Sequence, residues 1–208
     1  MPESSITRLE TVGTDTIAIE VETPAGFEAR PGQFVLVRAT VDGEEESGYY
    51  TISSPTVGET FEMTVAVDPD GTLGPWLGGR TLGDDVTVEG PFGDVQYTDD
   101  GDVLVLAGGP GIGPAVGIAE RALDTGHEAT VVYGGSEPPH GRRLTALEEA
   151  GATVVLSDDL ASAVGSLDVD GVQTYVFGFR GFVEEARAAL TDAGVDLDDV
   201  EIEGFGPE

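Results

Sequence analysis

Hydrophobic and polar residues alternate with a period of two in the first half of the chain. The clearest runs are rich in β-branched and aromatic residues and lie at positions 16–21, 33–38, 60–67 and 85–89. Turn residues such as Pro31-Gly32 and Asp70-Gly71 separate them. This pattern predicts a small antiparallel β-barrel, with a single helical turn at 74–77.

From residue 102 the pattern becomes strand, turn and helix in repetition. Apolar runs typical of buried parallel strands lie at 103–107, 128–133, 153–156 and 173–177, and helix-period segments lie at 115–125, 144–150 and 182–193. We therefore predict an α/β sheet of four or five parallel strands. A polar linker near 97–102 places the domain boundary so that residues 1–99 form the barrel and residues 100–208 the α/β domain.

The net charge changes the picture of the environment. The chain holds 40 acidic residues against nine basic ones, which gives −31, and all nine basic residues are arginines. Such a charge destabilises a compact state by self-repulsion unless salt screens it. Because the acids are spread over the whole sequence, we interpret them as adaptation to a salt-rich cytoplasm. Nucleic-acid binding, which needs a basic patch, is not expected.

Several classes of site and location are excluded by composition. The chain has no cysteine, so it forms no disulfide and carries no cysteine-ligated iron–sulfur cluster. The chain contains no stretch of 18 or more apolar residues, so we do not expect an integral membrane protein. The N-terminus lacks a secretory signal, so we expect a cytoplasmic protein. His127 and His140 have no suitable partners for a metal site, and we expect His140 to lie in an exposed loop.

A glycine turn follows the first buried strand of the second half. A strand that runs into such a turn and then a helix presents backbone N–H groups and the positive end of the helix to an anion. Gly108, Gly109 and Gly111 would let the backbone approach a pyrophosphate, and Pro114 suits the first helical turn. A purely structural turn is the alternative, since the spacing is not G-x-G-x-x-G.

Six fragments in order, spread over nearly the whole chain, resemble the ferredoxin–NADP reductase superfamily. They are RPGQFV (30–35), YTISS (50–54), Asp70-Gly71 with Trp76-Leu77, GPFG (90–93), LAGGPGIGP (106–114) and VVYGGS (131–136). The resemblance implies an N-terminal six-stranded antiparallel barrel that binds FAD, or occasionally FMN. It also implies a C-terminal five-stranded α/β domain that binds NADH or NADPH.

The resemblance also implies site residues. Tyr50 would pack on the flavin ring and Thr51 would hydrogen-bond near its reactive nitrogen. The rest of the cofactor-binding set comprises Ile52, Ser53, Val65, Val67, Gly71, Thr72, Leu73, Gly108, Gly109, Gly111, Ile112, Pro114, Gly134, Ser136, Glu137, Gly178 and Phe205. Glu137 would repel a 2′-phosphate and accept a bond from a ribose hydroxyl, which favours NADH, although Arg142 and Arg143 could reverse this preference.

The chain departs from the family pattern at two positions. Gly48 stands where the family has an arginine that pairs with the FAD pyrophosphate, and Arg38 or Arg80 could substitute for it. Phe177 replaces the cysteine that lies beside the nicotinamide, or else belongs to an aromatic strand-to-helix turn. Arg180 could contact a phosphate or cap a surface turn.

These features predict a flavin-dependent oxidoreductase that passes hydride from NAD(P)H to FAD. Its partners would be a nicotinamide dinucleotide and an electron acceptor, which could be a ferredoxin, a free flavin, a quinone or a partner enzyme. The alternative is a non-enzymatic nucleotide-sensing or electron-transfer subunit with weakened flavin binding. Gly48 and Phe177 support the alternative, whereas Tyr50 and Thr51 support the reductase.

Overall fold

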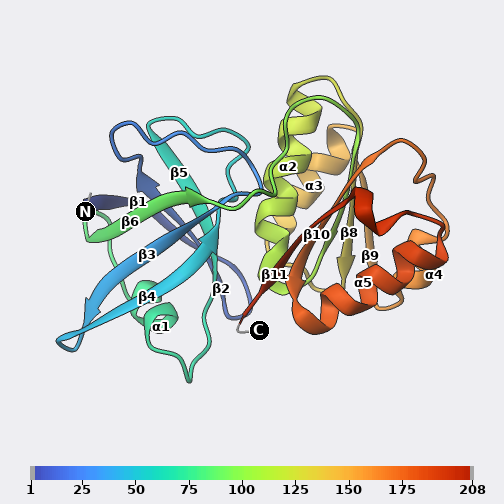
Figure 1. The fold of residues 1–208 in the computed structure, drawn as a ribbon. Coiled ribbons are helices and arrows are strands. Elements are labelled where there is room, and N and C mark those ends of the chain that lie inside the picture. The colour runs from blue at the N-terminus through green and yellow to red at the C-terminus, as the bar shows by residue number, and fades with distance from the viewer. Residues whose placement is uncertain (1–2, 207–208) are drawn as a thin grey trace.

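The computed structural model describes residues 3–206, which form two sheets side by side (Figure 1). The first sheet contains β1 (Glu3–Gly13), β2 (Thr16–Glu22), β3 (Phe34–Val41), β4 (Glu44–Thr51), β5 (Thr60–Ala66) and β6 (Asp85–Phe92). Its order is β4-β3-β6-β1-β2-β5, with every pairing antiparallel. The short helix α1 (Leu73–Gly78) confirms the helical turn expected at this position.

The second sheet confirms the expected parallel α/β half, with five strands. These are β7 (Val103–Ala107), β8 (Ala129–Gly134), β9 (Thr153–Ser157), β10 (Gln173–Phe179) and β11 (Val200–Phe205), in the order β11-β10-β7-β8-β9. The helices are α2 (Ile112–Asp124), α3 (Gly141–Glu149), α4 (Leu160–Val164) and α5 (Arg180–Asp192), with 3₁₀ turns η1 (Gly109–Gly111) and η2 (Leu197–Asp199).

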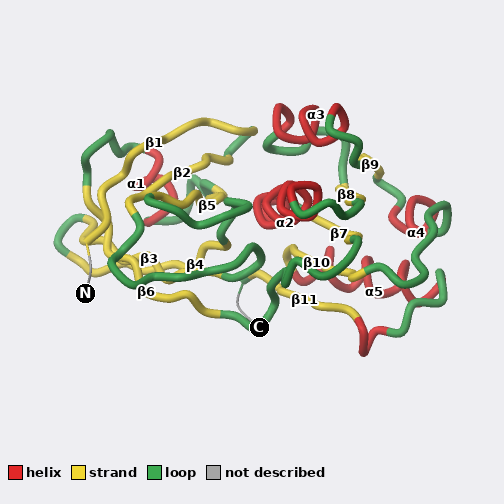
Figure 2. The backbone as a smooth tube through the Cα atoms, turned by 90° about the horizontal axis from the view of Figure 1, so that it is seen from above, coloured by secondary structure: helices red, strands yellow, loops and turns green. Residues whose placement is uncertain are grey.

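Helices cover both faces of the parallel sheet (Figure 2). Alternate residues of β7, such as Val105 and Leu104, belong to separate cores. The first core includes residues of α2 and α3, and the second includes residues of α4 and α5. Burial on both faces explains why β7 reads as an unbroken apolar run, because neither side of a central parallel strand meets water.

Two barrel strands were not expected from the pattern. β1 and β4 carry many polar residues, and β4 reads Glu-Glu-Glu-Ser-Gly-Tyr-Tyr-Thr with most side chains at least partly exposed. β4 and β5 are the edge strands of the antiparallel sheet. We call the gap between them the seam; the isolated bridge from Ile52 to Met63 lies across it.

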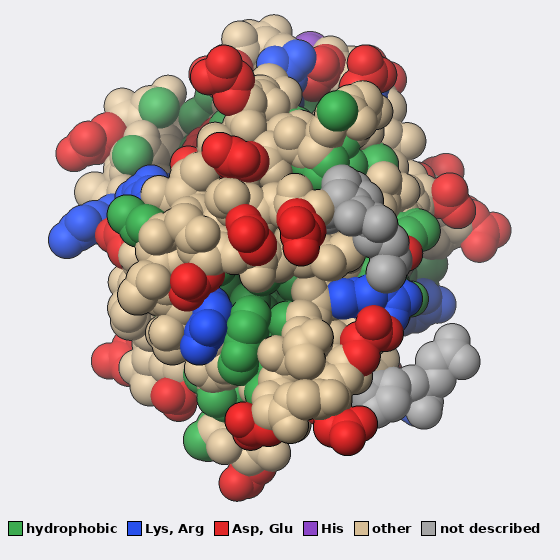
Figure 3. Space-filling view, turned by 90° about the vertical axis from the view of Figure 1, so that its left-hand side faces the viewer, with side chains coloured by type: hydrophobic (Ala, Val, Ile, Leu, Met, Phe, Trp, Pro, Cys, Tyr) green, Lys and Arg blue, Asp and Glu red, His purple; other side chains and the backbone are tan. Residues whose placement is uncertain are grey.

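Acidic side chains are scattered over the face of the antiparallel half in Figure 3, with few basic ones among them. Several arginines form ion pairs with nearby acidic side chains. Arg38 lies 2.7 Å from Glu89, and Arg121 lies 2.5 Å from Asp99. Arg121 lies on α2 and Asp99 in the segment between the two sheets, so this pair fixes the connection between them.

Candidate functional site

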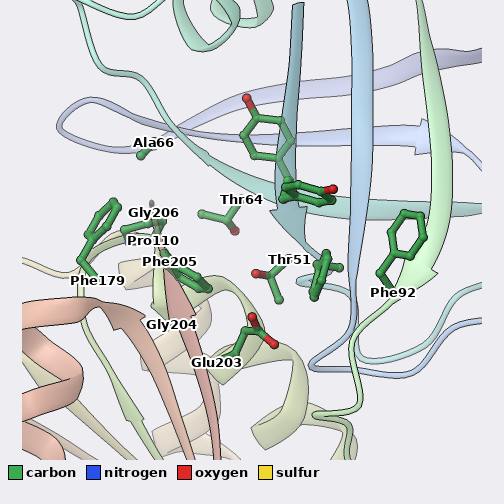
Figure 4. A pocket seen from close by; sticks show the side chains of 13 residues that line it. Thr51, Thr64, Ala66, Phe92, Pro110, Phe179, Glu203, Gly204, Phe205 and Gly206 are labelled. Atoms are coloured by element: carbon green, nitrogen blue, oxygen red, sulfur yellow. The ribbon is translucent and has the colours of Figure 1, made fainter. Parts of the chain in front are cut away.

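A cavity of about 440 Å³ lies where the two sheets meet (Figure 4). The antiparallel half contributes lining residues from β3, β4, β5 and β6, and the parallel half contributes the glycine turn and the ends of β10 and β11. The lining residues are Phe34, Tyr49, Tyr50, Thr51, Thr64, Ala66, Phe92, Pro110, Phe179, Glu203, Gly204, Phe205 and Gly206. The cavity has the size and the mainly apolar lining of a cofactor site.

Only a few polar side chains reach this cavity. Thr51 and Thr64 supply hydroxyl groups, and Glu203 supplies a carboxyl group. Burial, together with the nearby charge of Asp94, raises the pKa of Glu203 above its ordinary value. Among the residues that the structure describes, no arginine lines the cavity. The lining therefore suits a planar ring with polar edges better than it suits a group of phosphates.

Tyr50 and Gly48 lie two residues apart on β4, and the tyrosine ring covers the glycine. A Cβ atom at position 48 would lie 2.9 Å from the Tyr50 hydroxyl oxygen. A longer side chain there would force the ring to move. Burial raises the pKa of Tyr50 to about 12, so the phenol stays protonated. Gly48 is thus matched to the present position of Tyr50.

We call Phe34, Tyr49 and Phe92 the aromatic wall of the cavity. The ring centroid of Phe34 lies 5.5 Å from that of Tyr49 in an edge-to-face arrangement, and 6.0 Å from that of Phe92. Tyr49 is 67% exposed and Phe92 40% exposed, which is unusual for large aromatic side chains outside binding surfaces. Sequence reasoning missed this wall, because the three residues lie on three different strands.

The strand alternation on β5 decides which residues face the cavity. The side chain of Val65 lies in the barrel core, whereas Thr64 and Ala66 line the cavity. The candidates Ile52 and Ser53 are fully buried, Val67 is partly buried, and Gly71, Thr72 and Leu73 lie at the start of α1 rather than in the lining. Period-two alternation from the buried Val65 could have identified Thr64 and Ala66.

The glycine turn is packed against protein atoms. A Cβ atom at Gly111 would lie 2.1 Å from the carbonyl oxygen of Phe177, and that oxygen accepts a 3.0 Å hydrogen bond from the backbone N–H of Gly108. Gly109 adopts a positive φ of 55°. Ile112 and Pro114 are buried at the start of α2, and Pro110 alone of this turn lines the cavity.

Phe182, at the start of α5, fills the space in front of three candidate glycines. Cβ atoms at Gly108, Gly134 and Gly178 would lie 2.4, 2.7 and 2.6 Å from its ring atoms. These glycines lie at or next to the ends of three adjacent strands, β7, β8 and β10. Their small size is therefore explained by packing around one aromatic ring, whether or not a ligand also approaches them.

The remaining candidates of the parallel α/β half differ in exposure. Ser136 and Glu137 are exposed after β8. The Arg142 side chain is 94% exposed and lies 3.4 Å from Glu10. Arg143 instead turns towards the antiparallel half, where it binds Glu62. Of the two arginines, Arg142 has the freer guanidinium.

The aromatic strand-to-helix turn after β10 separates buried from exposed rings. Phe177 is fully buried and stacks on Tyr175 in the core beneath α2. Phe179 is 50% exposed and lines the cavity with Phe205, at a centroid distance of 6.1 Å. Arg180 pairs with Glu184 on the surface of α5.

The prediction that His140 lies in an exposed loop is wrong. His140 is 4% exposed, has a positive φ of 59°, and its Nε2 lies 2.7 Å from the Thr64 hydroxyl oxygen. Its backbone N–H donates to the carbonyl of Val12 at 2.9 Å. Burial, and then the charge of Arg143, lower the pKa of His140 to about 3, so it is neutral at physiological pH.

The structure places neither Arg38 nor Arg80 in the cavity lining. Arg38 donates to Glu89 and Glu45 on neighbouring strands. Arg80 lies over the ring of Trp76, 4.2 Å from its centroid, and donates to the Trp76 carbonyl. Both guanidinium groups thus bind partners that do not line the cavity.

Comparisons with known proteins agree with this geometry. Residues 3–97 match the model of the oxidoreductase FAD-binding domain family. The glycine betaine monooxygenase reductase subunit of Chromohalobacter salexigens is 37% identical over 121 residues, which are 56% of this chain and 33% of that protein. The chain thus spans about a third of the length of this curated relative.

Solved structures show the fold. A cytochrome P450 reductase from Amycolatopsis superimposes with a TM-score of 0.82 at 20% identity, covering 99% of this chain and 70% of that one. A ferredoxin–NADP⁺ reductase from Plasmodium falciparum gives 0.79 at 12% identity, covering 98% and 95%. The chain has the ferredoxin–NADP reductase-like fold, which confirms the expected fold class.

Proposed function

We propose that this chain is an NAD(P)H-dependent flavoprotein reductase, with FAD bound by residues 1–99 and the dinucleotide by residues 100–208. One observation carries the proposal: a mainly apolar cavity with two threonine hydroxyls lies where the half that matches an FAD-binding domain meets the parallel α/β half. Relatives and solved structures that resemble this chain include reductases and a reductase subunit, which supports the proposal.

The residues of the cavity suit the flavin ring. Tyr50 and Phe205 offer aromatic surface on opposite sides of the junction, one from each half, and Thr51 offers a hydroxyl at the end of β4. FAD, when bound, supplies the electron chemistry, taking two electrons from NAD(P)H and releasing them singly or in pairs. The protein's own part is to hold the reacting rings together and to exclude water from them.

Among residues 3–206, Glu203 is the one residue that brings a carboxyl group to the cavity lining. Its raised pKa allows it to hold a proton at higher pH than an ordinary glutamate, so it can donate as well as accept a hydrogen bond at the cavity wall. We propose that it orients the polar edge of a bound ring. Glu137, exposed after β8, favours NADH over NADPH because its charge repels a 2′-phosphate.

We also propose that the protein works in the cytoplasm at high salt and passes electrons to a separate partner protein or a small acceptor. The net charge of −31 and the absence of lysine support the high-salt environment. Within residues 3–206 no helix is long and apolar enough to cross a membrane. The glycine betaine monooxygenase reductase relatives are subunits, which supports a partner oxygenase or electron carrier.

The test is an anaerobic visible absorption spectrum of the protein purified in multimolar KCl, before and after NADH. We expect a flavin spectrum that bleaches, and the same titration with NADPH compares the two coenzymes. A protein that takes up neither FAD nor FMN would refute the reductase and favour the nucleotide-sensing subunit, the alternative that Gly48 supports.

The stacking role of Tyr50 has its own test. Tyr50→Ala removes the ring from the cavity wall, and we expect the dissociation constant of FAD, measured by quenching of flavin fluorescence, to rise by roughly tenfold or more. Leu82→Ala, an exposed residue of the same half that does not line this cavity, is the control. Unchanged FAD affinity in Tyr50→Ala would exclude the stacking role.

A further inference from the structure

We propose that Arg143, from the parallel α/β half, is a positioning residue that holds the seam between β4 and β5 closed. We call the part of the cavity that Thr51 and Thr64 line, on the two sides of this seam, the flavin seat. This inference rests on the proposed function. It starts from the topology, because β4 and β5 are the two edges of the antiparallel sheet and their ladder is not continuous. Thr51 lies at the end of β4 and Thr64 on β5, so the cavity is lined from both sides of the seam.

Few contacts within the antiparallel half close the seam. Besides the bridge from Ile52 to Met63, the backbone N–H of Ser53 donates to the Glu62 carbonyl at 2.8 Å. The Ser53 hydroxyl donates to the Glu62 carboxylate at 3.0 Å, and the backbone N–H of Glu62 donates to the Ser54 hydroxyl at 2.7 Å. These bonds tie together the segments that carry Thr51 and Thr64.

Arg143 adds bonds to both sides of the seam. From α3 its Nη1 donates to the Glu62 carboxylate at 2.8 Å, and its Nη2 donates to the Ser53 carbonyl at 2.6 Å. The same guanidinium makes two bonds to Glu120 of α2, at 2.8 and 2.7 Å, which fix its orientation. Only a planar fork with several donors can make these bonds at once.

The contact is also close and partly shielded from solvent. The side chains of Arg143, Glu62 and Glu120 are 22, 15 and 27% exposed, so salt screens this network less than it screens an exposed pair. Near Ser53 the halves meet at short distance, since a Cβ at Gly117 of α2 would lie 2.8 Å from the Ser53 carbonyl oxygen. The guanidinium of Arg143 thus acts together with this close backbone packing to hold the segments of Ser53 and Glu62 at their spacing.

Arg143→Met tests the inference, and Arg142→Met is a matched control with the same change of charge at the neighbouring position. Arg142 is 94% exposed and has one 3.4 Å contact. We expect Arg143→Met to raise the FAD dissociation constant by about tenfold or more, equivalent to about 1.4 kcal/mol, and Arg142→Met to change it less than about twofold. Arg143→Met should also reduce the limiting rate of flavin reduction by NADH while the NADH dissociation constant changes little.

Hydrogen exchange provides a readout that needs no flavin. We expect the amides of Ser53 and Glu62 to lose protection about tenfold in Arg143→Met and to keep it in Arg142→Met. Arg143→Lys keeps the charge without the fork, so it should give intermediate values, and it carries the test if Arg143→Met does not fold.

The inference is overturned if Arg143→Met matches Arg142→Met in amide protection and FAD affinity, or if Arg143→Lys retains every wild-type value. A wild-type protein that binds no flavin would instead refute the proposed reductase. In that case the protection of Ser53 and Glu62 still decides whether Arg143 closes the seam.

Discussion

Gly111→Ala distinguishes a structural from a ligand-binding role of the glycine turn. In the structure the added Cβ would lie 2.1 Å from the carbonyl oxygen of Phe177, a backbone atom that cannot rotate away. That carbonyl also accepts the hydrogen bond from Gly108. The substitution therefore creates a steric clash between η1, at the start of α2, and β10, even when no dinucleotide is bound.

The magnitude follows from the overlap. Ordinary contact of a Cβ begins near 3.4 Å, so turn and strand must separate by roughly 1.3 Å. Overpacking of a rigid core costs about 1–3 kcal/mol, and a backbone atom as the obstacle places this case near 3 kcal/mol. For a chain of this length, that lowers the midpoint of thermal unfolding by roughly 6–12 °C.

Urea unfolding without nucleotide, at fixed salt and followed by circular dichroism, measures the effect. Gly181→Ala is the control, because nothing lies within 4 Å of its added Cβ and its position at the start of α5 favours alanine by up to about 1 kcal/mol. We expect the midpoint to fall in Gly111→Ala and to stay level or rise in Gly181→Ala.

A different pattern would refute this reasoning. If Gly111→Ala unfolds like the wild type but loses affinity for NADH, then the glycine serves the approach of the ligand. The packing against Phe177 would in that case be of no consequence for stability. If both stability and affinity fall, the loss of affinity follows from displacement of the turn.

Three further outcomes are expected. The pKa of His140 is lowered to about 3 in the folded protein, so below about pH 6.5 the unfolded chain binds a proton that the folded chain does not. The free energy of unfolding therefore falls as the pH is lowered towards 3, by at most about 1.4 kcal/mol per pH unit. His140→Gln should reduce this pH dependence in urea unfolding measured at pH 7 and pH 5, and an equal pH dependence in the variant and the wild type would contradict the assignment. Asp94→Asn removes a negative charge near Glu203 and should lower the pKa of that carboxyl, as measured by ¹³C NMR titration, whereas an unchanged pKa would leave burial as the whole cause. Glu137→Arg should raise the preference for NADPH over NADH by roughly tenfold in kcat/KM, and an unchanged ratio would remove this residue from coenzyme selection.

The fold class could be predicted from the sequence because apolar runs and period-two alternation each span only a few neighbouring residues. The run 103–107 is apolar on both faces, and the structure buries all of β7. Alternation found β2, β3, β5 and β6, but not β1 or β4, because these two strands carry many polar side chains and few of their residues are buried. The short helix α4 was also missed, since its five residues are too few to show a helical period.

The site was predicted less completely, because its residues meet through long-range contacts. The candidates Tyr50 and Thr51 line the cavity, but Thr64, which was not a candidate, lines it because β5 closes against β4 across the seam. The burial of His140 depends on contacts with β1 and β5, more than 70 residues away in sequence. No pattern within a window of the sequence contains that information.

The position of Phe182 limits how this half of the protein can change in length. One ring lies against the ends of β7, β8 and β10, so the three strands must finish at the same height. A residue inserted into any one of them would replace a glycine beside the ring with a side chain that does not fit. Insertions should be accepted beyond Ser136, where the chain is exposed, but not a few residues earlier. The packing of a single aromatic side chain therefore fixes where β7, β8 and β10 can end.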